Sequence, residues 1–196
     1  MARKRGGLSF YTKEKKFNTK IFAEIMSWVF WGVVMSLIAF VFVYLFGIRT
    51  SIIGPSMEPR LYNAQEILID RFTYILFSPK QGDVVVFRPN GNENAHYYVK
   101  RVIGCPGDTV LIKDGVIYIN NVIYDENGMF DHAEYAGIAE NMLTLGDDEY
   151  FVLGDNLNDS EDSRSSNIGF VKKDYIIGRA WFHFSSVNGD PAGLIK

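Results

Sequence analysis

The chain has 196 residues, a formal net charge of -3 and a single cysteine. This length allows a membrane anchor plus one domain with a sizeable core but does not favour two large domains, and one cysteine excludes an intramolecular disulfide. The charge is uneven: through Met26, seven Lys or Arg residues stand against two Glu residues, a local net charge of +5 that leaves -8 for the rest. A basic tail is typical of nucleic-acid binding or of a membrane surface, and the segment after it decides between the two.

An uncharged apolar segment follows the basic tail. Residues 25–48 contain no charged side chain and lie between Glu24 and Arg49. As a helix they span about 36 Å, against about 30 Å for the hydrocarbon core of a bilayer. The alternative is a cleavable signal peptide, which has a shorter apolar region and a small-x-small cleavage site that the following "LFGIRTSIIG" does not resemble. The pattern favours a retained single-pass anchor over nucleic-acid binding.

The basic residues before the anchor also predict its orientation. Clustered Lys and Arg stay on the cytoplasmic side of a membrane. We therefore expect a cytoplasmic tail at residues 1–24, a transmembrane anchor at residues 25–48 and an extracytoplasmic domain at residues 49–196, located at the cytoplasmic membrane.

Beyond the anchor, the pattern changes to short runs rich in β-branched and aromatic residues, bounded by Gly, Pro, Asn and Asp. "KDG" at Lys113–Gly115 predicts a hairpin turn, because Asp-Gly readily adopts positive φ values. "RPNGNENAH" at residues 88–96 predicts a polar hairpin loop. The fold class is mostly β, with strands predicted at Glu66–Asp70, Asp83–Phe87, Tyr97–Ile103, Thr109–Ile112, Val116–Asn120, Tyr150–Leu153 and Ile176–Phe182.

Residues 104–149 are predicted to form a smaller, variable β subdomain. Their second part, from about residue 125, is less regular than the strands around it. "HAEYAGIAENML" at residues 132–143 is a helix candidate there.

Ser56, in "GPSMEP", lies just beyond the apolar segment and is a candidate nucleophile. A serine hydroxyl attacks poorly unless a nearby base removes its proton. The chain has three histidines, His96, His132 and His183, but none has an obvious carboxylate partner in the sequence. A Ser-His-Asp triad stays an alternative, and a neutral lysine is the other candidate base.

Lys100, in "YYVKRVIG", is the lysine whose setting suggests this role. The two-residue alternation of a strand puts it on the same face as Tyr98 and Val102. Apolar neighbours desolvate an ammonium group and lower its pKa, and a shift of about 2.5 units is equivalent to roughly 3 kcal/mol. A lysine that reaches water from a sheet edge is the alternative, and periodicity alone does not exclude it.

Four motifs together resemble a known family. "GPSMEP", "GDVVVF", "KRVIGCPGD" and "GDNLNDSEDSR" are similar, in this order and behind a membrane span, to the motifs of type I signal peptidases. The single span and the short separation of Ser56 and Lys100 resemble the compact Gram-positive members. The resemblance covers nearly the whole chain except residues 125–149. It implies a β-sheet catalytic domain related to the LexA-type proteases, and a serine endopeptidase that cleaves signal peptides from exported preproteins by a Ser-Lys dyad.

The resemblance also assigns roles to individual residues. Ser56 matches the nucleophile, Lys100 the general base, and Ser160 the serine that orients the lysine amine. The Ser56 backbone N–H matches an oxyanion donor, whereas Gly54 stands where many Gram-negative members have a serine that supplies the second donor, so the second donor stays open. The matching charged positions that hold the loops of the site are Arg101, Asp155, Asp162 and Arg164. The matching substrate-pocket positions, which accept small side chains before the cut, are Ile52, Met57, Leu61 and Val99.

The expected partners are signal peptides of secretory preproteins and the lipid bilayer, with the secretion translocon as a further candidate and no nucleic acid. No metal or cofactor is expected, because "DNLNDSEDS" lacks the ligand order of a calcium loop. Two alternatives remain, one that shares the Ser-Lys chemistry and one from another class. A LexA-type repressor would carry a DNA-binding domain where this chain has its apolar segment, and a catalytically silent membrane-anchored β-domain would act as a binding protein.

Overall fold

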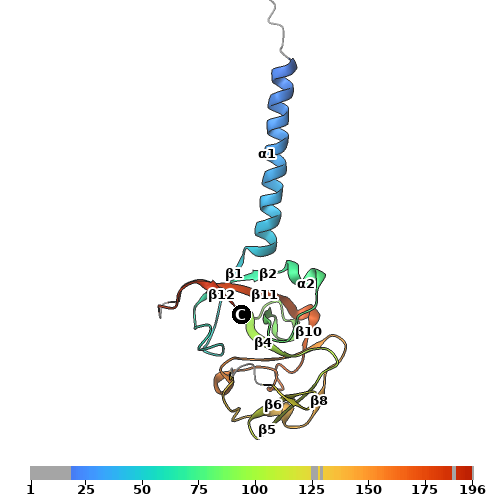
Figure 1. Ribbon diagram of the computed structural model, residues 1–196, viewed down its shortest axis with the longest axis vertical. Coiled ribbons are helices and arrows are strands. Elements are labelled where there is room, and N and C mark those ends of the chain that lie inside the picture. Colours follow the sequence, from blue (N-terminus) through green and yellow to red (C-terminus); the bar gives the residue numbers. More distant parts are fainter. Residues whose placement is uncertain (1–18, 125–127, 129, 187–188, 196) are drawn as a thin grey trace, which may run out of the picture. The chain divides into compact units, whose positions relative to one another are not determined.

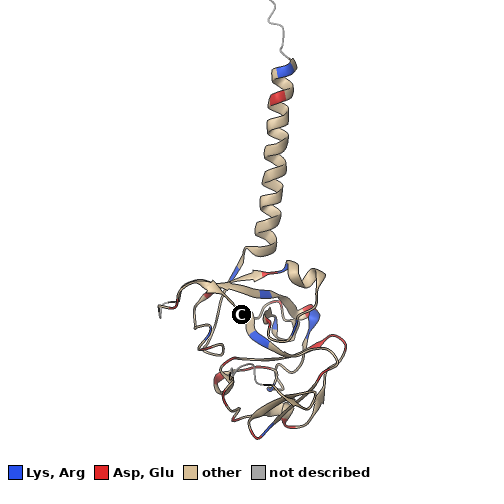
Figure 2. Ribbon diagram, viewed as in Figure 1, with Lys and Arg blue, Asp and Glu red and all other residues tan. Residues whose placement is uncertain are grey.

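The computed structural model describes residues 19–124, 128, 130–186 and 189–195. Its contacts divide the chain into two units, residues 1–40 and residues 41–196. The first long element, α1 (Thr19–Phe46), is a helix without a buried residue. Lys20 and Glu24 lie near its start, and the rest of the helix carries no charged residue and is tan in Figure 2. By length and composition, this helix is long and apolar enough to cross a membrane.

A large antiparallel sheet organises residues 41–196 (Figure 1). Its strand order is β1-β2-β11-β3-β4-β9-β10, and β12 pairs with β11. Two short elements lie between its strands, the helix α2 (Phe72–Leu76) and the 3-10 helix η1 (Pro89–Gly91). The strands are β1 (Ile48–Ser51), β2 (Glu66–Asp70), β3 (Val84–Phe87), β4 (Tyr98–Gly104), β9 (Glu149–Leu153), β10 (Val171–Lys172), β11 (Ile176–His183) and β12 (Gly193–Leu194).

A second, four-stranded sheet has the order β7-β6-β5-β8. In Figure 1 it lies at the end of residues 41–196 away from β1 and β2. Asp114 and Gly115 connect β5 to β6 with φ values of 50° and 75°, so the predicted hairpin turn is confirmed. The strands are β5 (Thr109–Lys113), β6 (Val116–Ile119), β7 (Val122–Ile123) and β8 (Leu143–Thr144).

The mostly β prediction is confirmed, and all seven predicted strands are present within about one residue of their expected ends. Residues 88–96 connect the antiparallel strands β3 and β4, as predicted for a hairpin loop. The strands β1, β7, β8, β10 and β12 were not predicted. Four of them have only two residues, which is too few to show periodicity, and β1 ("IRTS") has a single apolar residue. The extents predicted for the tail, the anchor and the subdomain stay predictions.

The helix candidate at residues 132–143 is wrong. The chain there forms only the 3-10 helix η2 (Gly137–Glu140) before β8. Gly137 has a φ of 59°, outside the right-handed helical region, and a Cβ at this position would overlap the backbone of Arg164. The Ile138 N–H donates to the Arg164 carbonyl at 3.0 Å. Packing against the Arg164 loop therefore replaces the local helical preference.

The core of the large sheet positions the site. β3 is buried along its whole length because it lies between β11 and β4, which explains its uninterrupted apolar sequence "VVVF". β4 lies next to it, between β3 and β9, and is buried from Val99 to Gly104. A charged residue on β4 is therefore held in the middle of the sheet and away from water.

Candidate active site

Ser56 lies in the turn-rich segment between β1 and β2, and hydrogen bonds with Asn63 and Asn156 help to hold the backbone around it. The Gly54 N–H donates to Asn63 Oδ1 at 2.9 Å, and the Ser56 carbonyl accepts from the Asn156 N–H at 3.0 Å. Asn156 Nδ2 donates to the Pro55 carbonyl at 3.4 Å. Gly54 has a φ of 86°, which side chains other than glycine rarely adopt. The backbone therefore explains why a glycine precedes Ser56 by two positions.

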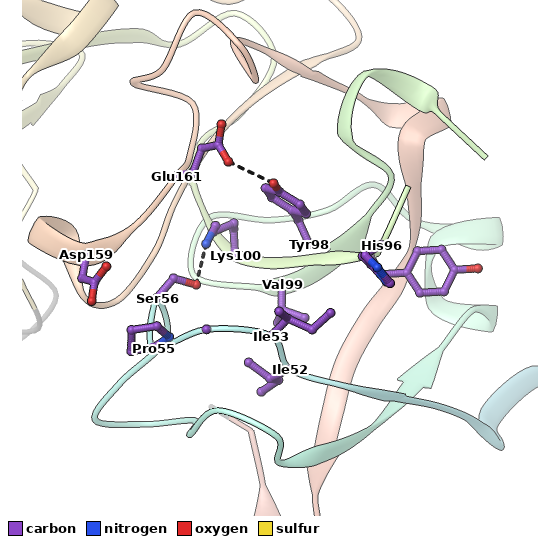
Figure 3. Close-up of a pocket in the computed structure, with 12 residues that line it drawn as sticks. Ile52, Ile53, Pro55, Ser56, His96, Tyr98, Val99, Lys100, Asp159 and Glu161 are labelled. Atoms are coloured by element: carbon purple, nitrogen blue, oxygen red, sulfur yellow. Dashed lines mark hydrogen bonds between the residues drawn. The ribbon is translucent and has the colours of Figure 1, made fainter. Parts of the chain in front are cut away.

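Lys100 reaches Ser56 from β4. Its Nζ lies 2.5 Å from Ser56 Oγ, and Figure 3 shows the two side chains directed toward each other. The residue is only 4% exposed, and Ser56 is 8% exposed. Lys100 Nζ also lies 5.8 Å from the ring centroid of Tyr98, on the face that strand alternation predicts. The lysine is thus placed in the interior and not at a solvent-exposed sheet edge.

Burial lowers the pKa of Lys100 from its usual value to about 8. Desolvation is the largest cause because it penalises the charged ammonium form. Asp162, Glu161 and Asp155 oppose this by raising the pKa, whereas Arg164 lowers it further. A substantial fraction of the amine is therefore neutral at mildly alkaline pH.

Arg101 lies next to Lys100 in the chain but has a different environment. Its Nε and Nη2 each donate to an oxygen of Asp155 at 2.8 Å, and its Nη1 donates to the Gly82 carbonyl at 2.8 Å. Arg101 and Asp155 are both buried. A second cation, Arg60, lies 3.5 Å from Asp155 Oδ2 and is partly exposed. The bidentate Arg101–Asp155 pair joins β4 to the loop that follows β9.

A second buried pair braces the same loop. Arg164 Nε and Nη2 each donate to an oxygen of Asp162 at 2.8 Å. Asp162 also accepts from the Gly154 N–H at 3.2 Å, and Arg164 Nη2 donates to the Leu157 carbonyl. The predicted charged residues therefore form two separate Arg-carboxylate pairs behind the Ser56–Lys100 pair.

Ser160 lies in this loop beside Gly154. A Cβ at Gly154 would overlap Ser160 Oγ and the Ser56 carbonyl, so glycine is required for the loop to approach Ser56. Ser160 Oγ is buried and has no hydrogen-bond partner among the described residues. The hydrogen bond expected between Ser160 and the Lys100 amine is therefore not formed in this structure, and its orienting role stays a prediction.

The backbone around Ser56 bears on the oxyanion donors. The Ser56 N–H makes no hydrogen bond with another described residue, so it is available to a ligand. The Gly54 N–H already donates to Asn63 Oδ1, which makes it a poor second donor. The second donor stays open.

A cavity of about 280 Å³ opens beside the Ser56–Lys100 pair. Of the four predicted substrate-pocket residues, Ile52 and Val99 line it. Met57 and Leu61 are buried in the same core cluster as Ile52 and Val99 but do not line this cavity. A direct contact of Met57 or Leu61 with substrate stays a prediction.

Sequence reasoning missed several residues that line the cavity. Tyr98 could have been found, because it shares a strand face with Lys100, whereas nothing in the sequence distinguished Glu161 from its neighbours in an acidic loop. Tyr98 Oη donates to Glu161 Oε2 at 3.0 Å. The other lining residues that were not predicted are Ile53, Pro55, His96, Tyr97 and Asp159.

The structure offers little to the alternative chemistries. His96 lines the cavity, but among the described residues the side chain hydrogen-bonded to Ser56 Oγ is that of Lys100. Within the described part of the chain, no three His, Cys, Asp or Glu side chains are grouped so that they could hold a metal ion.

Comparison with known proteins gives the family. The model of the family described as "Signal peptidase, peptidase S26" matches residues 25–185. A probable signal peptidase I-2 of Synechocystis sp. is 36% identical over 148 residues, covering 70% of this chain and 66% of that protein. Signal peptidase I P of Bacillus subtilis subsp. natto is 33% identical over 180 residues, covering 85% of this chain and 90% of that protein. Signal peptidase IB of Staphylococcus aureus is 32% identical over 180 residues, covering 82% of this chain and 90% of that protein.

A crystal structure of a signal peptidase I from Enterococcus faecalis is also similar, with 32% identity, a TM-score of 0.42, and coverage of 53% of this chain and 97% of that chain. The family match spans more than half of the sequence, so this chain belongs to the signal peptidase family, peptidase S26. The resemblance that the four sequence motifs indicated is confirmed.

Proposed function

We propose that this chain is a membrane-anchored serine endopeptidase that removes N-terminal signal peptides from exported preproteins. The family supports signal peptide cleavage. The observation that carries the mechanism is the 2.5 Å separation of Lys100 Nζ and Ser56 Oγ, at the wall of a cavity with apolar residues. A base within hydrogen-bonding distance of a hydroxyl is the arrangement that activates a serine nucleophile.

In the proposed reaction, neutral Lys100 takes the proton of Ser56 as Oγ attacks the scissile carbonyl carbon. The resulting oxyanion accepts a hydrogen bond from the Ser56 N–H. The C–N bond then breaks, and the Lys100 ammonium gives its proton to the departing amine of the mature protein. An ester between Ser56 and the signal peptide remains. A water molecule gives a proton to Lys100 as it attacks this ester. Lys100 passes that proton to Ser56 Oγ as the C–O bond breaks, and the peptide leaves as a carboxylic acid that loses its proton to solvent.

The buried Arg-carboxylate pairs support this chemistry by holding the loops. Arg101–Asp155 and Arg164–Asp162 each balance one positive with one negative charge. Lys100 has no ion pair among the described residues, so its positive charge is the least compensated of the buried cations. Loss of the Lys100 proton therefore leaves the buried cluster nearly neutral. In this scheme, Ser160 orients the neutral amine.

The substrate is proposed to bind as an extended segment beside β4. Ile52 and Val99 supply apolar contacts for the small residues that precede the cut in signal peptides. Met57 and Leu61 limit the depth of this surface from below, because both are buried in the same cluster. The substrate backbone pairs with the adjacent strand edge, as in other complexes that add a strand to a sheet.

We also propose that α1 anchors the protein in the cytoplasmic membrane. Its 28 residues are all outside the core, and the segment from residue 25 onward carries no charge. The proposed topology is a cytoplasmic tail at residues 1–24, a span at residues 25–48 and an extracytoplasmic domain at residues 49–196, with residues 104–149 as its smaller subdomain. The bilayer is then a partner, and the secretion translocon, which delivers preproteins to this side, is a further candidate.

The test is cleavage of a preprotein with an Ala-x-Ala site by the full chain in detergent. Mass spectrometry of the products should show a single cut after the second alanine. Ser56→Ala and Lys100→Ala should both be inactive while retaining the wild-type circular dichroism spectrum. Cleavage by Lys100→Ala at the wild-type rate would overturn the lysine base, and binding without any cleavage by the wild type would favour a silent binding domain.

A further inference from the structure

The cavity beside Ser56 has walls of two kinds. Ile52, Ile53 and Val99 line one side, whereas Asp159 and Glu161 bring two carboxylates to the same cavity from the segment after β9. Figure 3 shows Asp159 across Ser56 from the three apolar residues, and Glu161 next to Lys100 and Tyr98. A substrate that occupies this cavity therefore meets an apolar surface and an acidic surface on different sides of the reacting hydroxyl.

Both carboxylates are accessible and are not neutralised by a neighbouring cation. Asp159 and Glu161 are exposed, and neither has an ion pair with another described residue. Glu161 Oε2 accepts a hydrogen bond from Tyr98 Oη at 3.0 Å, which fixes the position of the carboxylate. The lining residues include one lysine, Lys100, and no arginine. When Lys100 is neutral, as the reaction requires, the Lys, Asp and Glu side chains of the cavity wall carry a net charge of about -2.

The segment that carries these carboxylates is well supported. The 3-10 helix η3 (Leu157–Asp159) has a buried Leu157, whose carbonyl accepts a hydrogen bond from Arg164. The Asp159 N–H donates to the Asn156 carbonyl at 3.3 Å. The two carboxylates are therefore presented by a braced loop, and a charge on the substrate meets them at little cost in loop ordering.

We infer that Asp159 and Glu161 are specificity-determining residues that favour a basic side chain on the mature side of the cut, at the first or second residue after it. This inference rests on the proposed function, because it needs a peptide that crosses Ser56. Residues before the cut occupy the apolar side, so an extended chain places the residues after the cut on the opposite side of Ser56, where Asp159 lies. A lysine or arginine there is attracted by the two carboxylates, and an acidic residue is repelled.

The test uses internally quenched peptides that share one Ala-x-Ala site and differ only after the cut. The first or the second residue after the cut is Lys, Gln or Glu. For the full chain in detergent, kcat/KM should be about fivefold higher for Lys than for Gln in at least one of the two positions, with Glu lower again. Raising the salt from about 0.05 M to about 0.5 M should reduce this ratio.

Variants assign the effect to the two carboxylates. Asp159→Asn should lower the Lys-to-Gln ratio without moving the pH profile, because Asp159 is not among the charges that shift the pKa of Lys100. The double variant Asp159→Asn with Glu161→Gln should bring the ratio close to one. Asp147→Asn, a matched change at an exposed residue that does not line the cavity, should leave the ratio at its wild-type value.

The outcomes separate this inference from the function on which it rests. If the wild type cuts the Gln peptides and Ser56→Ala does not, the proposed function stands. The Lys-to-Gln ratio of kcat/KM then tests the role of Asp159 and Glu161 by itself. Equal rates for Lys, Gln and Glu, or a ratio that survives in the double variant, would overturn the inference. Failure of the wild type to cut any peptide would overturn the proposed function and the inference together.

Discussion

Two neighbouring regions of the protein treat buried cations in opposite ways. Behind the site, Arg101 and Arg164 each form a bidentate pair with a buried carboxylate, Asp155 or Asp162. At the site, Lys100 is almost as buried but has a serine hydroxyl as its hydrogen-bond partner. A guanidinium stays charged at any working pH, so it needs a carboxylate, whereas a lysine denied one can lose its proton. The difference teaches that the lack of a carboxylate partner, and not burial alone, sets a lysine with a lowered pKa apart from the buried arginines that stay charged.

The largest expected effect comes from giving the site a cation that cannot lose its proton. Lys100→Arg keeps a positive charge at this position but supplies no neutral base at working pH. The rate of preprotein cleavage should fall by about 1000-fold or more, as for removal of a catalytic residue that acts as a unit with its partner. Lys80→Arg, at an exposed position outside the site, is the control and should cleave normally. An active Lys100→Arg would show that the site does not need a side chain that can lose its proton.

Breaking one of the buried Arg-carboxylate pairs should reduce the stability of the fold. Arg164→Met leaves the Asp162 carboxylate buried without its partner, which should reduce the free energy of unfolding by about 3–5 kcal/mol. Urea denaturation followed by tryptophan fluorescence measures this change. Arg88→Met, which removes an exposed ion pair with Glu93, should cost at most about 1 kcal/mol. Similar losses for the two variants would contradict the structural role of the buried pair.

Removing the buried cation at the site, Lys100, should change the free energy of unfolding in the opposite direction. The pKa of Lys100 falls from 10.5 to about 8 on folding, so at pH 7 the folded protein holds an ammonium group that is more stable in the unfolded chain. Lys100→Met removes this penalty and should raise the free energy of unfolding at pH 7 by up to about 3 kcal/mol. The gain should shrink as the pH rises from 8 and fall to about 0.4 kcal/mol near pH 10.5, where the amine is neutral in the folded protein and half neutral in the unfolded chain.

Urea denaturation of both proteins at pH 7 and at pH 10.5 tests this sign. An equal difference at the two pH values would mean that packing of the methionine, and not desolvation of the lysine, causes the effect. A destabilised Lys100→Met at pH 7 would contradict the prediction. The comparison with Arg164→Met is then direct, because both variants replace a buried cation with the same side chain.

The smallest expected effect is a shift of the pH profile. Cleavage should rise with pH through a limb centred near 8, because the proposed mechanism uses the neutral form of Lys100 as the base. Glu161 raises the pKa of Lys100, together with Asp162 and Asp155 and against Arg164, so Glu161→Gln should move the limb to lower pH. A shift to higher pH, or a wild-type limb near 10.5, would show that the amine is not governed by burial and these neighbours. Asp147→Asn is the control and should leave the limb in place.

Local patterns in the sequence determined the apolar helix, seven of the strands and the Asp114–Gly115 turn, because strand alternation, helix length and turn chemistry depend on neighbouring residues. The order of the four motifs identified the family and pointed to Ser56 and Lys100. The helix expected at residues 132–143 failed for a non-local reason, the close approach of Gly137 to Arg164.

Only the tertiary structure decided which of these residues lie in contact and how far each is exposed to solvent. Burial of Lys100 depends on β4 lying between β3 and β9, and the carboxylate partners of Arg101 and Arg164 come from a loop that strand periodicity does not place. The same packing buried Met57 in a core cluster with Ile52 and Val99 and placed Glu161 at the cavity wall. The motif around Lys100 identifies this residue from the sequence. Its pKa depends on the solvent and charges around it in space, so only the assembled sheet lowers that pKa.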